Sequence, residues 1–127
     1  MRWGDMDAYQ HVNNTAYLTY VEQARVAMFY DNPELAAHEF AGGVVIAKHE
    51  VEYLKPVTYH PEPLRIELWI AHLGGASLTV VQDVYDGDAL ACRVTSVSVR
   101  YDFAAGVPTR ITPTEREALA KYFDDAA

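Results

Sequence analysis

Residues 13–30, NNTAYLTYVEQARVAMFY, have the spacing of a helix with one apolar face. Tyr17, Val21, Ala24 and Met28 recur at steps of four, three and four residues, which places their side chains on one side of a helix. The two asparagines that open the stretch are good N-cap residues, because their short side chains accept hydrogen bonds from the free N–H groups of the first turn. We therefore expect one long helix, ended by the DNP that follows.

Beyond this helix the period of the sequence changes to two, which is typical of half-buried strands. Four such stretches are predicted as strands: VVIAKHEVEYLKPV (44–57), PLRIELWIAHL (63–73), SLTVVQDVYDG (77–87) and ALACRVTSVSVRYDF (89–103). The links between them are short and rich in Pro, Gly and Asp, so consecutive strands should be antiparallel. Residues 34–43 are predicted as a loop or short helical turn, and residues 1–4 as the end of a strand.

A second helix is predicted from Pro113 to Asp124. Thr112 as N-cap, Pro113 at the first position and Glu115 three residues after the cap form a capping box. Together the elements predict a single α+β domain over residues 1–127, with a long central helix wrapped by an antiparallel β-sheet and a C-terminal helix. Because one helix covers only one face of a sheet, we expect association with a second copy.

Composition excludes several classes of protein. The 127 residues are 50% hydrophobic and carry a formal charge of −8, with only ten scattered Lys and Arg, which argues against nucleic acid as a partner. No apolar run is long enough to span a membrane, and the start has no apolar signal region. The one cysteine, Cys92, lies in an alternating apolar stretch and is predicted to be a small buried side chain. We expect a cytoplasmic protein.

No cofactor or metal is expected. His38, His49, His60 and His72 are scattered, without the close spacing or cysteine partners of a metal site. The sequence contains no phosphate-binding loop, no dinucleotide fingerprint and no GxSxG motif of serine hydrolases.

The loop before the long helix is a candidate site for acyl chemistry. It contains Asp5, Asp7 and His11 and leads into a helix N-terminus, where free N–H groups can stabilise a carbonyl oxygen that acquires negative charge. A nearby carboxylate can act as nucleophile or as general base toward water. The residue types leave a second reading open, in which the aspartates only cap the helix or hold a turn.

The string RWGDMDAYQHVNNTAYLTYVEQAR, residues 2–25, closely resembles the signature of hotdog-fold acyl-thioesterases. The resemblance is to the 4-hydroxybenzoyl-CoA thioesterase-like family and its long-chain acyl-CoA relatives. It runs through the second Asp of DMD, the HVNN element and a YxxYxExAR helix, and continues more weakly through the four strands. It implies an acyl-CoA or acyl-carrier thioester as substrate, and homodimers or dimers of dimers with active sites at the subunit interface.

The resemblance also implies roles for residues of the loop. Asp7 matches the catalytic carboxylate, and the backbone N–H of Asn14 matches the amide that polarises the thioester carbonyl. In the similar plant acyl-carrier-protein thioesterases an Asp, an Asn and a His act together, but here Tyr9 stands where the Asn would be. His11 would therefore orient a water or the thioester, or only hold the loop. Three further residues of the segment are expected to contact substrate: Tyr9, Asn13 and Tyr17.

The sequence departs from the family at two places. The family usually has most of a strand before RWGDMD, whereas this chain begins inside it. The stretch from His72 to Ser77, HLGGAS, lacks the basic cluster that binds the coenzyme A phosphates in the 4-hydroxybenzoyl branch. Coenzyme A would then be bound by other cations, for which the candidates are Lys48, Lys55, Arg93 and Arg100.

Three residues of the signature are expected to be structural. Glu22 and Arg25 are three apart on the helix and can pair with each other, and Asp5 would support the loop. Two other functions are compatible with the scaffold. One is a non-catalytic acyl-binding or assembly module, and the other is a dehydratase or hydratase, from which HVNN and YxxYxExAR point away.

Overall fold

The computed structural model describes residues 1–37 and 40–123. Its longer elements are helix α1 (Ala16–Asp31) and the strands β1 (Val44–Tyr53), β2 (Arg65–Leu73), β3 (Ser77–Asp86) and β4 (Ala89–Asp102). Its shorter elements are the helices α2 (Pro33–Ala37) and α3 (Pro113–Leu119), the strand β5 (Val107–Pro108) and the 3-10 turns η1 (Trp3–Asp5), η2 (Phe40–Gly43) and η3 (Ala120–Tyr122).

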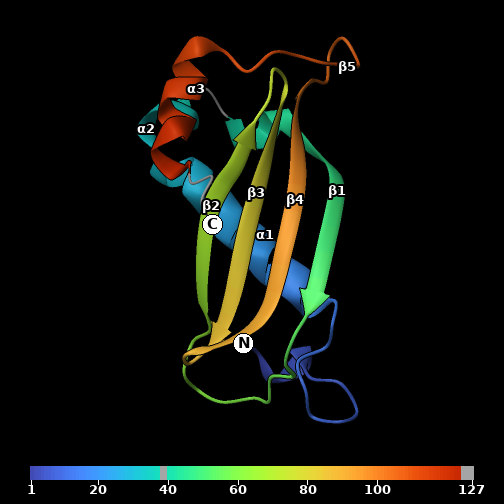
Figure 1. Cartoon of the computed structure of the whole chain (residues 1–127). Coiled ribbons are helices and arrows are strands. Elements are labelled where there is room, and N and C mark those ends of the chain that lie inside the picture. Colours follow the sequence, from blue (N-terminus) through green and yellow to red (C-terminus); the bar gives the residue numbers. More distant parts are fainter. Residues whose placement is uncertain (38–39, 124–127) are drawn as a thin grey trace.

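The four long strands form an antiparallel sheet in the order β1-β4-β3-β2, as Figure 1 shows. Its register pairs Val51 with Val94 and Val84 with Cys92, which keeps the apolar positions of neighbouring strands on the same face. β5 pairs only with the end of β4, and β1 and β2 are the edges. The predicted α+β class, four strands and antiparallel pairing are confirmed.

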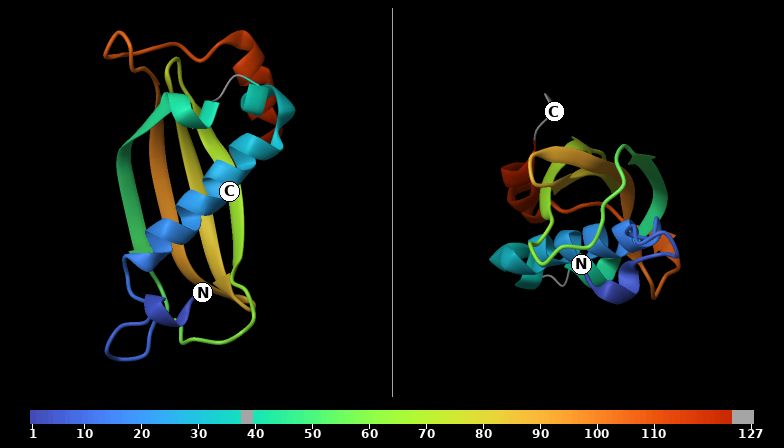
Figure 2. Two further views of the ribbon diagram at one scale, coloured as in Figure 1. Left: turned by 180° about the vertical axis from the view of Figure 1, so that it is seen from behind. Right: turned by 90° about the horizontal axis from the view of Figure 1, so that it is seen from below.

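Helix α1 crosses the inner face of the sheet diagonally, which is plain from behind (Figure 2). Its N-terminal half packs in a buried group with the ends of β3 and β4: Tyr17, Val21, Val84, Cys92 and Val94. Its C-terminal half packs with α2, α3 and the opposite end of the sheet in a second group: Phe29, Leu35, Phe40, Ile70 and Leu119. Gln82 joins helix and sheet, because its Nε2 donates to the Val21 carbonyl at 2.6 Å.

The face that α1 buries differs by one position from the prediction. Tyr17, Val21 and Met28 are buried as expected, but Ala24 is only half-buried, and its neighbour Arg25 is 5% exposed. The apolar spacing placed Ala24 and not Arg25 on the buried face.

Two predictions about the N-terminal segment were wrong. Residues 1–4 do not form the end of a strand, because the chain turns in η1, where Asp5 N donates to the Arg2 carbonyl at 2.9 Å. The helix begins at Ala16 and not at residue 13, with Thr15 as the preceding residue. The Oδ1 of Asn13 accepts from the N and Oγ1 of Thr15, so this side chain shapes a turn before the helix.

The first strand ends at Tyr53, four residues earlier than predicted. Pro56 has no N–H to donate, and the N–H groups of Leu54 and Lys55 both point at the Ala91 carbonyl. Within the stretch predicted as a loop or short helical turn, residues 34–37 belong to α2 and residues 40–43 form η2, so the described part of it is helical. The short strand β5 was not predicted.

The capping box of the C-terminal helix is confirmed. Glu115 N donates to Thr112 Oγ1 at 3.1 Å, and Thr112 N donates to Glu115 Oε1 at 3.0 Å. α3 ends at Leu119 and passes into η3, while the predicted end at Asp124 lies outside the described residues. The buried position of Cys92 is also confirmed, and burial raises the pKa of its thiol to about 11.

None of the helices in the described part of the chain is long and apolar enough to cross a membrane.

Arg100 ties α3 to the sheet, and we predict that Arg100→Met destabilises the fold. Its Nη2 lies 3.0 Å from Oε2 of Glu115, which is 2% exposed, and its Nη1 donates to the Gly43 carbonyl at 2.8 Å. The substitution leaves a buried carboxylate without its cation, so we expect a loss of about 3 kcal/mol in the free energy of unfolding, measured with urea. The exposed Arg110, changed to Met, should alter it by less than about 0.5 kcal/mol.

Candidate active site

The loop that contains Asp7 is a tight reversal held by its own backbone. Asp7 N donates to the His11 carbonyl at 2.8 Å, and Gln10 N donates to the Asp7 carbonyl at 3.0 Å. Gln10 adopts a positive φ of 63°, an uncommon conformation for a residue other than glycine. The reversal sets Met6 opposite Val12 as an antiparallel bridge, so the Asp7 side chain is presented from a closed and defined turn.

The same loop is anchored to the segment that follows β1. Val12 N donates to the Val57 carbonyl at 2.7 Å, and His11 forms a bridge with Thr58. On its other side, Asn13 N donates to the Asp5 carbonyl at 2.7 Å. These contacts join parts of the chain that are distant in sequence and place the loop beside the C-terminal end of β1.

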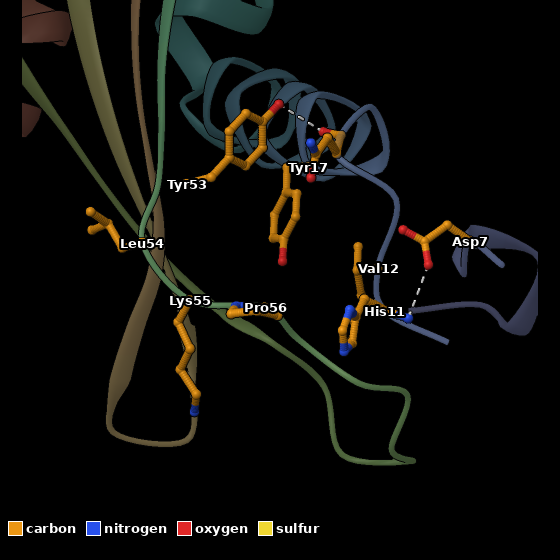
Figure 3. A pocket seen from close by; sticks show the side chains of 9 residues that line it. Asp7, His11, Val12, Tyr17, Tyr53, Leu54, Lys55 and Pro56 are labelled. Atoms are coloured by element: carbon orange, nitrogen blue, oxygen red, sulfur yellow. Dashed lines mark hydrogen bonds between the residues drawn. The ribbon is translucent and has the colours of Figure 1, made fainter. Parts of the chain in front are cut away.

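A hollow of about 240 Å³ lies between this loop, the start of α1 and the end of β1. It is lined by Asp7, His11, Val12, Asn14, Tyr17, Tyr53, Leu54, Lys55 and Pro56. Figure 3 shows the Tyr17 and Tyr53 rings on the sheet side of this hollow and Asp7 on the side of the loop. The rings meet edge to face, with centroids 5.7 Å apart.

One oxygen of the Asp7 carboxylate is bound, and the other has no partner among the described residues. Oδ1 accepts from the backbone N–H groups of Tyr9 at 2.9 Å and His11 at 3.3 Å. These bonds orient the half-buried carboxylate and leave Oδ2 with its lone pairs available.

Asn14 presents a free backbone donor at the start of the helix. In the described structure no acceptor bonds its N–H, while its carbonyl accepts from the Tyr53 hydroxyl at 3.0 Å. Residue 14 is therefore held through its carbonyl, and its N–H lies next to the positive end of the α1 dipole. Such a donor suits an oxygen that gains negative charge.

The structure brings together four of the six predicted site residues. Asp7, His11, Asn14 and Tyr17 all line the hollow. Tyr9 is 81% exposed and lies outside it. Asn13 borders a different hollow, next to Arg2 and Asp5, and its Oδ1 is occupied by Thr15.

Residues at the end of β1 complete the hollow, and of these only Lys55 had been considered from the sequence, as a candidate cation for coenzyme A. They are Tyr53, Leu54, Lys55 and Pro56. The one local sign of this segment in the sequence was Pro56, where the alternation of apolar and polar residues along the first strand is interrupted. Tyr17 is buried against this segment, and burial raises its pKa to about 12, so its hydroxyl keeps a proton to donate.

Of the four cations considered for coenzyme A, one borders the hollow. Lys55 lines it, with Nζ 3.8 Å from Oδ2 of Asp86. Arg93 is engaged by both oxygens of Asp83, at 2.7 and 2.8 Å. Arg100 is held by Glu115, and Lys48 is exposed on β1.

Asp5 supports the loop from behind. Its Oδ2 accepts from the Tyr20 hydroxyl at 2.5 Å and from Arg2 N at 2.9 Å, and Oδ1 pairs with the Arg2 guanidinium at 3.0 Å. The hydrogen bond from Tyr20 is the main cause that lowers the pKa of Asp5 to about 2. Tyr20, one of the tyrosines of YxxYxExAR, thus connects α1 to the loop.

No metal site is evident in the part of the chain that the structure describes, where no three His, Cys, Asp or Glu side chains gather in a suitable group.

The architecture is the hotdog fold, and solved thioesterase structures superpose on it. A predicted thioesterase from Bacillus stearothermophilus is 23% identical, with a TM-score of 0.89 over 100% of this chain and 94% of that chain. A thioesterase from Thermus thermophilus, in complex with coenzyme A and zinc, is 28% identical, with a TM-score of 0.84 over 96% and 88% of the two chains. The candidate thioesterase PA2801 from Pseudomonas aeruginosa is 33% identical, with a TM-score of 0.77 over 93% and 92%.

A comparison with curated proteins gave no significant match. Residues 1–121 match the sequence model of the Thioesterase-like superfamily, and the chain belongs to that family. The predicted resemblance is thereby confirmed, as is the prediction of a thioesterase enzyme.

The hydrogen bond between Tyr20 and Asp5 predicts a pH-dependent effect of Tyr20→Phe. Because the folded pKa of Asp5 lies near 2, below its ordinary 3.8, its contribution to stability is present above about pH 4 and lost as the pH falls toward 2. The variant should lose about 1 to 2 kcal/mol of unfolding free energy at pH 7 and much less near pH 2. Urea unfolding at several pH values measures this difference, and the exposed Tyr30→Phe should show none of it.

Proposed function

We propose that this thioesterase hydrolyses acyl-CoA or acyl-carrier thioesters to free acid and thiol, with Asp7 as the reacting carboxylate. The observation that carries the proposal is the pair of unused groups in one hollow: the Oδ2 of Asp7 and the N–H of Asn14. An acyl transfer needs an activated oxygen and a stabiliser for the oxyanion, and these two groups have those chemical properties.

The Asn14 N–H would donate to the thioester carbonyl oxygen and stabilise the charge that develops on it. As general base, Asp7 takes a proton from a water whose oxygen attacks the carbonyl carbon, and the carbon–sulfur bond then breaks as the proton passes to the thiolate. As nucleophile, Asp7 attacks the carbon itself, which breaks the carbon–sulfur bond, expels the thiolate and forms a mixed anhydride. Water then hydrolyses the anhydride to the free acid and the Asp7 carboxylate, and the proton that the water loses converts the thiolate into the thiol. The bound Oδ1 and free Oδ2 are compatible with both routes.

The other residues of the hollow have supporting roles in the proposal. The protonated Tyr17 hydroxyl can donate to the bound thioester. The backbone of His11 orients Asp7, while its ring either orients a water or the thioester or holds the loop. Tyr9 and Asn13 lie outside the hollow, where they would contact the carrier end of the substrate.

Coenzyme A is the carrier that we favour. The Thermus thermophilus relative was solved with coenzyme A bound. Lys55 lines the hollow, and its half-exposed side chain holds Nζ 3.8 Å from Oδ2 of Asp86, which leaves the cation accessible to a phosphate. The net charge of −8 acts in the opposite direction, because it disfavours an anionic ligand. We further propose a homodimer or a dimer of dimers, working in the cytoplasm, where the single buried thiol of Cys92 stays reduced.

Removing the carboxylate should abolish most activity. We expect Asp7→Asn to lower kcat/KM for acyl-CoA substrates by about 100-fold or more, since the amide can neither take a proton nor attack. Thiol release from a panel of acyl-CoAs measures it, and Asp88→Asn in the exposed β3–β4 turn should have no effect. Turnover of D7N within a few fold of the parent would show that Asp7 is not the reacting group. Binding by the parent protein without thiol release would favour a non-catalytic acyl-binding module.

Lys55 should affect affinity for the carrier and not the chemical step. Lys55→Ala is expected to raise KM for acyl-CoA about five- to tenfold with kcat nearly unchanged, because an exposed ion pair contributes about 1 kcal/mol. Lys55→Arg should restore KM, and added salt should reduce the difference between parent and variant. Lys121→Ala, an exposed cation near the end of α3, is the control. An unchanged KM in K55A would place the phosphates elsewhere.

A further inference from the structure

The hydroxyl of Tyr53 joins the end of strand β1 to the turn that precedes helix α1. Tyr53 is the last residue of β1, where it pairs with Cys92 of β4. Its hydroxyl donates to the Asn14 carbonyl at 3.0 Å, and its ring lies edge to face with Tyr17 (Figure 3). Burial raises the pKa of Tyr53, so the hydroxyl keeps the proton that it donates. One side chain thus connects the sheet to the residue whose N–H is free in the hollow.

The bonds within the turn fix the direction of the Asn14 N–H but do not tie the turn to the sheet. Ala16 N donates to the Asn13 carbonyl at 2.9 Å, and Asn13 Oδ1 accepts from Thr15 N at 3.0 Å. The Asn13 carbonyl and the Asn14 N–H belong to one planar trans peptide, so they point in opposite directions. These bonds therefore orient the N–H relative to its own turn only.

Tyr53 supplies the attachment to the sheet. Among the described residues no other donor bonds the Asn14 carbonyl. The loop of Asp7 is attached to the same segment of chain, because Val12 N donates to the Val57 carbonyl at 2.7 Å. The segment from Tyr53 to Val57 thus anchors both groups that the proposed reaction needs, with the oxyanion donor at one end and the carboxylate at the other.

We propose that Tyr53 is a positioning residue, which holds the Asn14 N–H in the place relative to the Asp7 loop that attack on a thioester requires. It acts through Asn14 and not on the reacting atoms. An oxyanion donor is most effective when it is in place before the charge develops, and a misplacement of about 1 Å can cost about 100-fold in rate. The inference rests on the proposed function, which assigns the Asn14 N–H to the thioester carbonyl.

Tyr53→Phe tests this role, because it keeps the ring beside Tyr17 and removes only the hydroxyl. We expect kcat for acyl-CoA hydrolysis to fall about tenfold with KM within about twofold, since the donor is misplaced while the binding surface is retained. Tyr59→Phe is the matched control. Tyr59 is 43% exposed against 47% for Tyr53 and packs edge to face with Trp3, but its hydroxyl has no hydrogen-bond partner among the described residues.

Two further measurements separate positioning from a general structural effect. A thioether analogue of the acyl-CoA, with a methylene in place of the carbonyl, should inhibit Y53F and the parent protein equally, because it presents no oxygen to the Asn14 N–H. In backbone NMR relaxation of the protein without ligand, the Asn14 amide should become more mobile in Y53F. The amides of Asp7 and Val57 should stay as rigid as in the parent, because their own bonds are intact.

The contrary results are distinct from one another. A kcat of Y53F within about twofold of the parent, or an equal loss in Y59F, would refute the positioning role. So would an Asn14 amide whose mobility is unchanged in Y53F, whatever the substrate. A raised KM together with weaker inhibition by the thioether would overturn it as well, because Tyr53 would then contact the substrate itself.

Failure of the proposed function gives a different pattern. In that case the parent protein releases no thiol, or D7N stays active. Failure of the positioning role alone leaves D7N inactive while Y53F and Y59F both turn over like the parent.

Discussion

The structure depends on one geometric constraint, which is that a single helix must cover a sheet of four long strands. α1 has sixteen residues and so spans about 24 Å. It lies diagonally, with its start near the end of β1 and its end near β2 and the short C-terminal helix (Figures 1 and 2). The ends of the helix therefore meet different surroundings. Its C-terminal half is closed into a core by α2 and α3, and its N-terminal end stays open to solvent beside the loop.

The candidate site arises because local hydrogen bonds hold some of its polar groups in place and leave others free. The Asn14 carbonyl is bound by Tyr53, and Oδ1 of Asp7 is bound by backbone N–H groups of its own turn. Behind them, Tyr20 and Arg2 hold Asp5. Among the groups left free in the described residues are Oδ2 of Asp7 and the backbone N–H of Asn14. A site held this way is preorganised, because its reactive groups do not have to be released from other bonds before they act.

The diagonal path of the helix also explains why Arg25 and the edge strand β1 line the same groove. Where α1 moves away from β1, it leaves both a strand face uncovered and a guanidinium facing a groove.

Local patterns predicted the elements well wherever one interaction dominates. The alternation of apolar residues identified the four strands, and Thr112 and Glu115 identified the start of α3, because a capping box depends only on neighbours in sequence. Prediction failed where two local choices compete. Asn13 could cap the helix or bond Thr15, and the second won, so the helix begins later. Ala24 and Arg25 are adjacent, and only packing against the sheet decided which of them is buried.

The sequence by itself determined the fold class, the family and the position of Asp7 and Asn14 before a helix, because these depend on periodicity and on a motif with fixed spacing. The tertiary structure alone decided that Tyr53, Leu54 and Lys55 complete the hollow, and that Tyr9 and Asn13 lie outside it. The physical reason is the hydrogen bond from Val12 N to the Val57 carbonyl. It joins the loop that precedes α1 to the segment that follows β1 in the chain. A contact between residues so distant in the chain leaves no trace in local spacing.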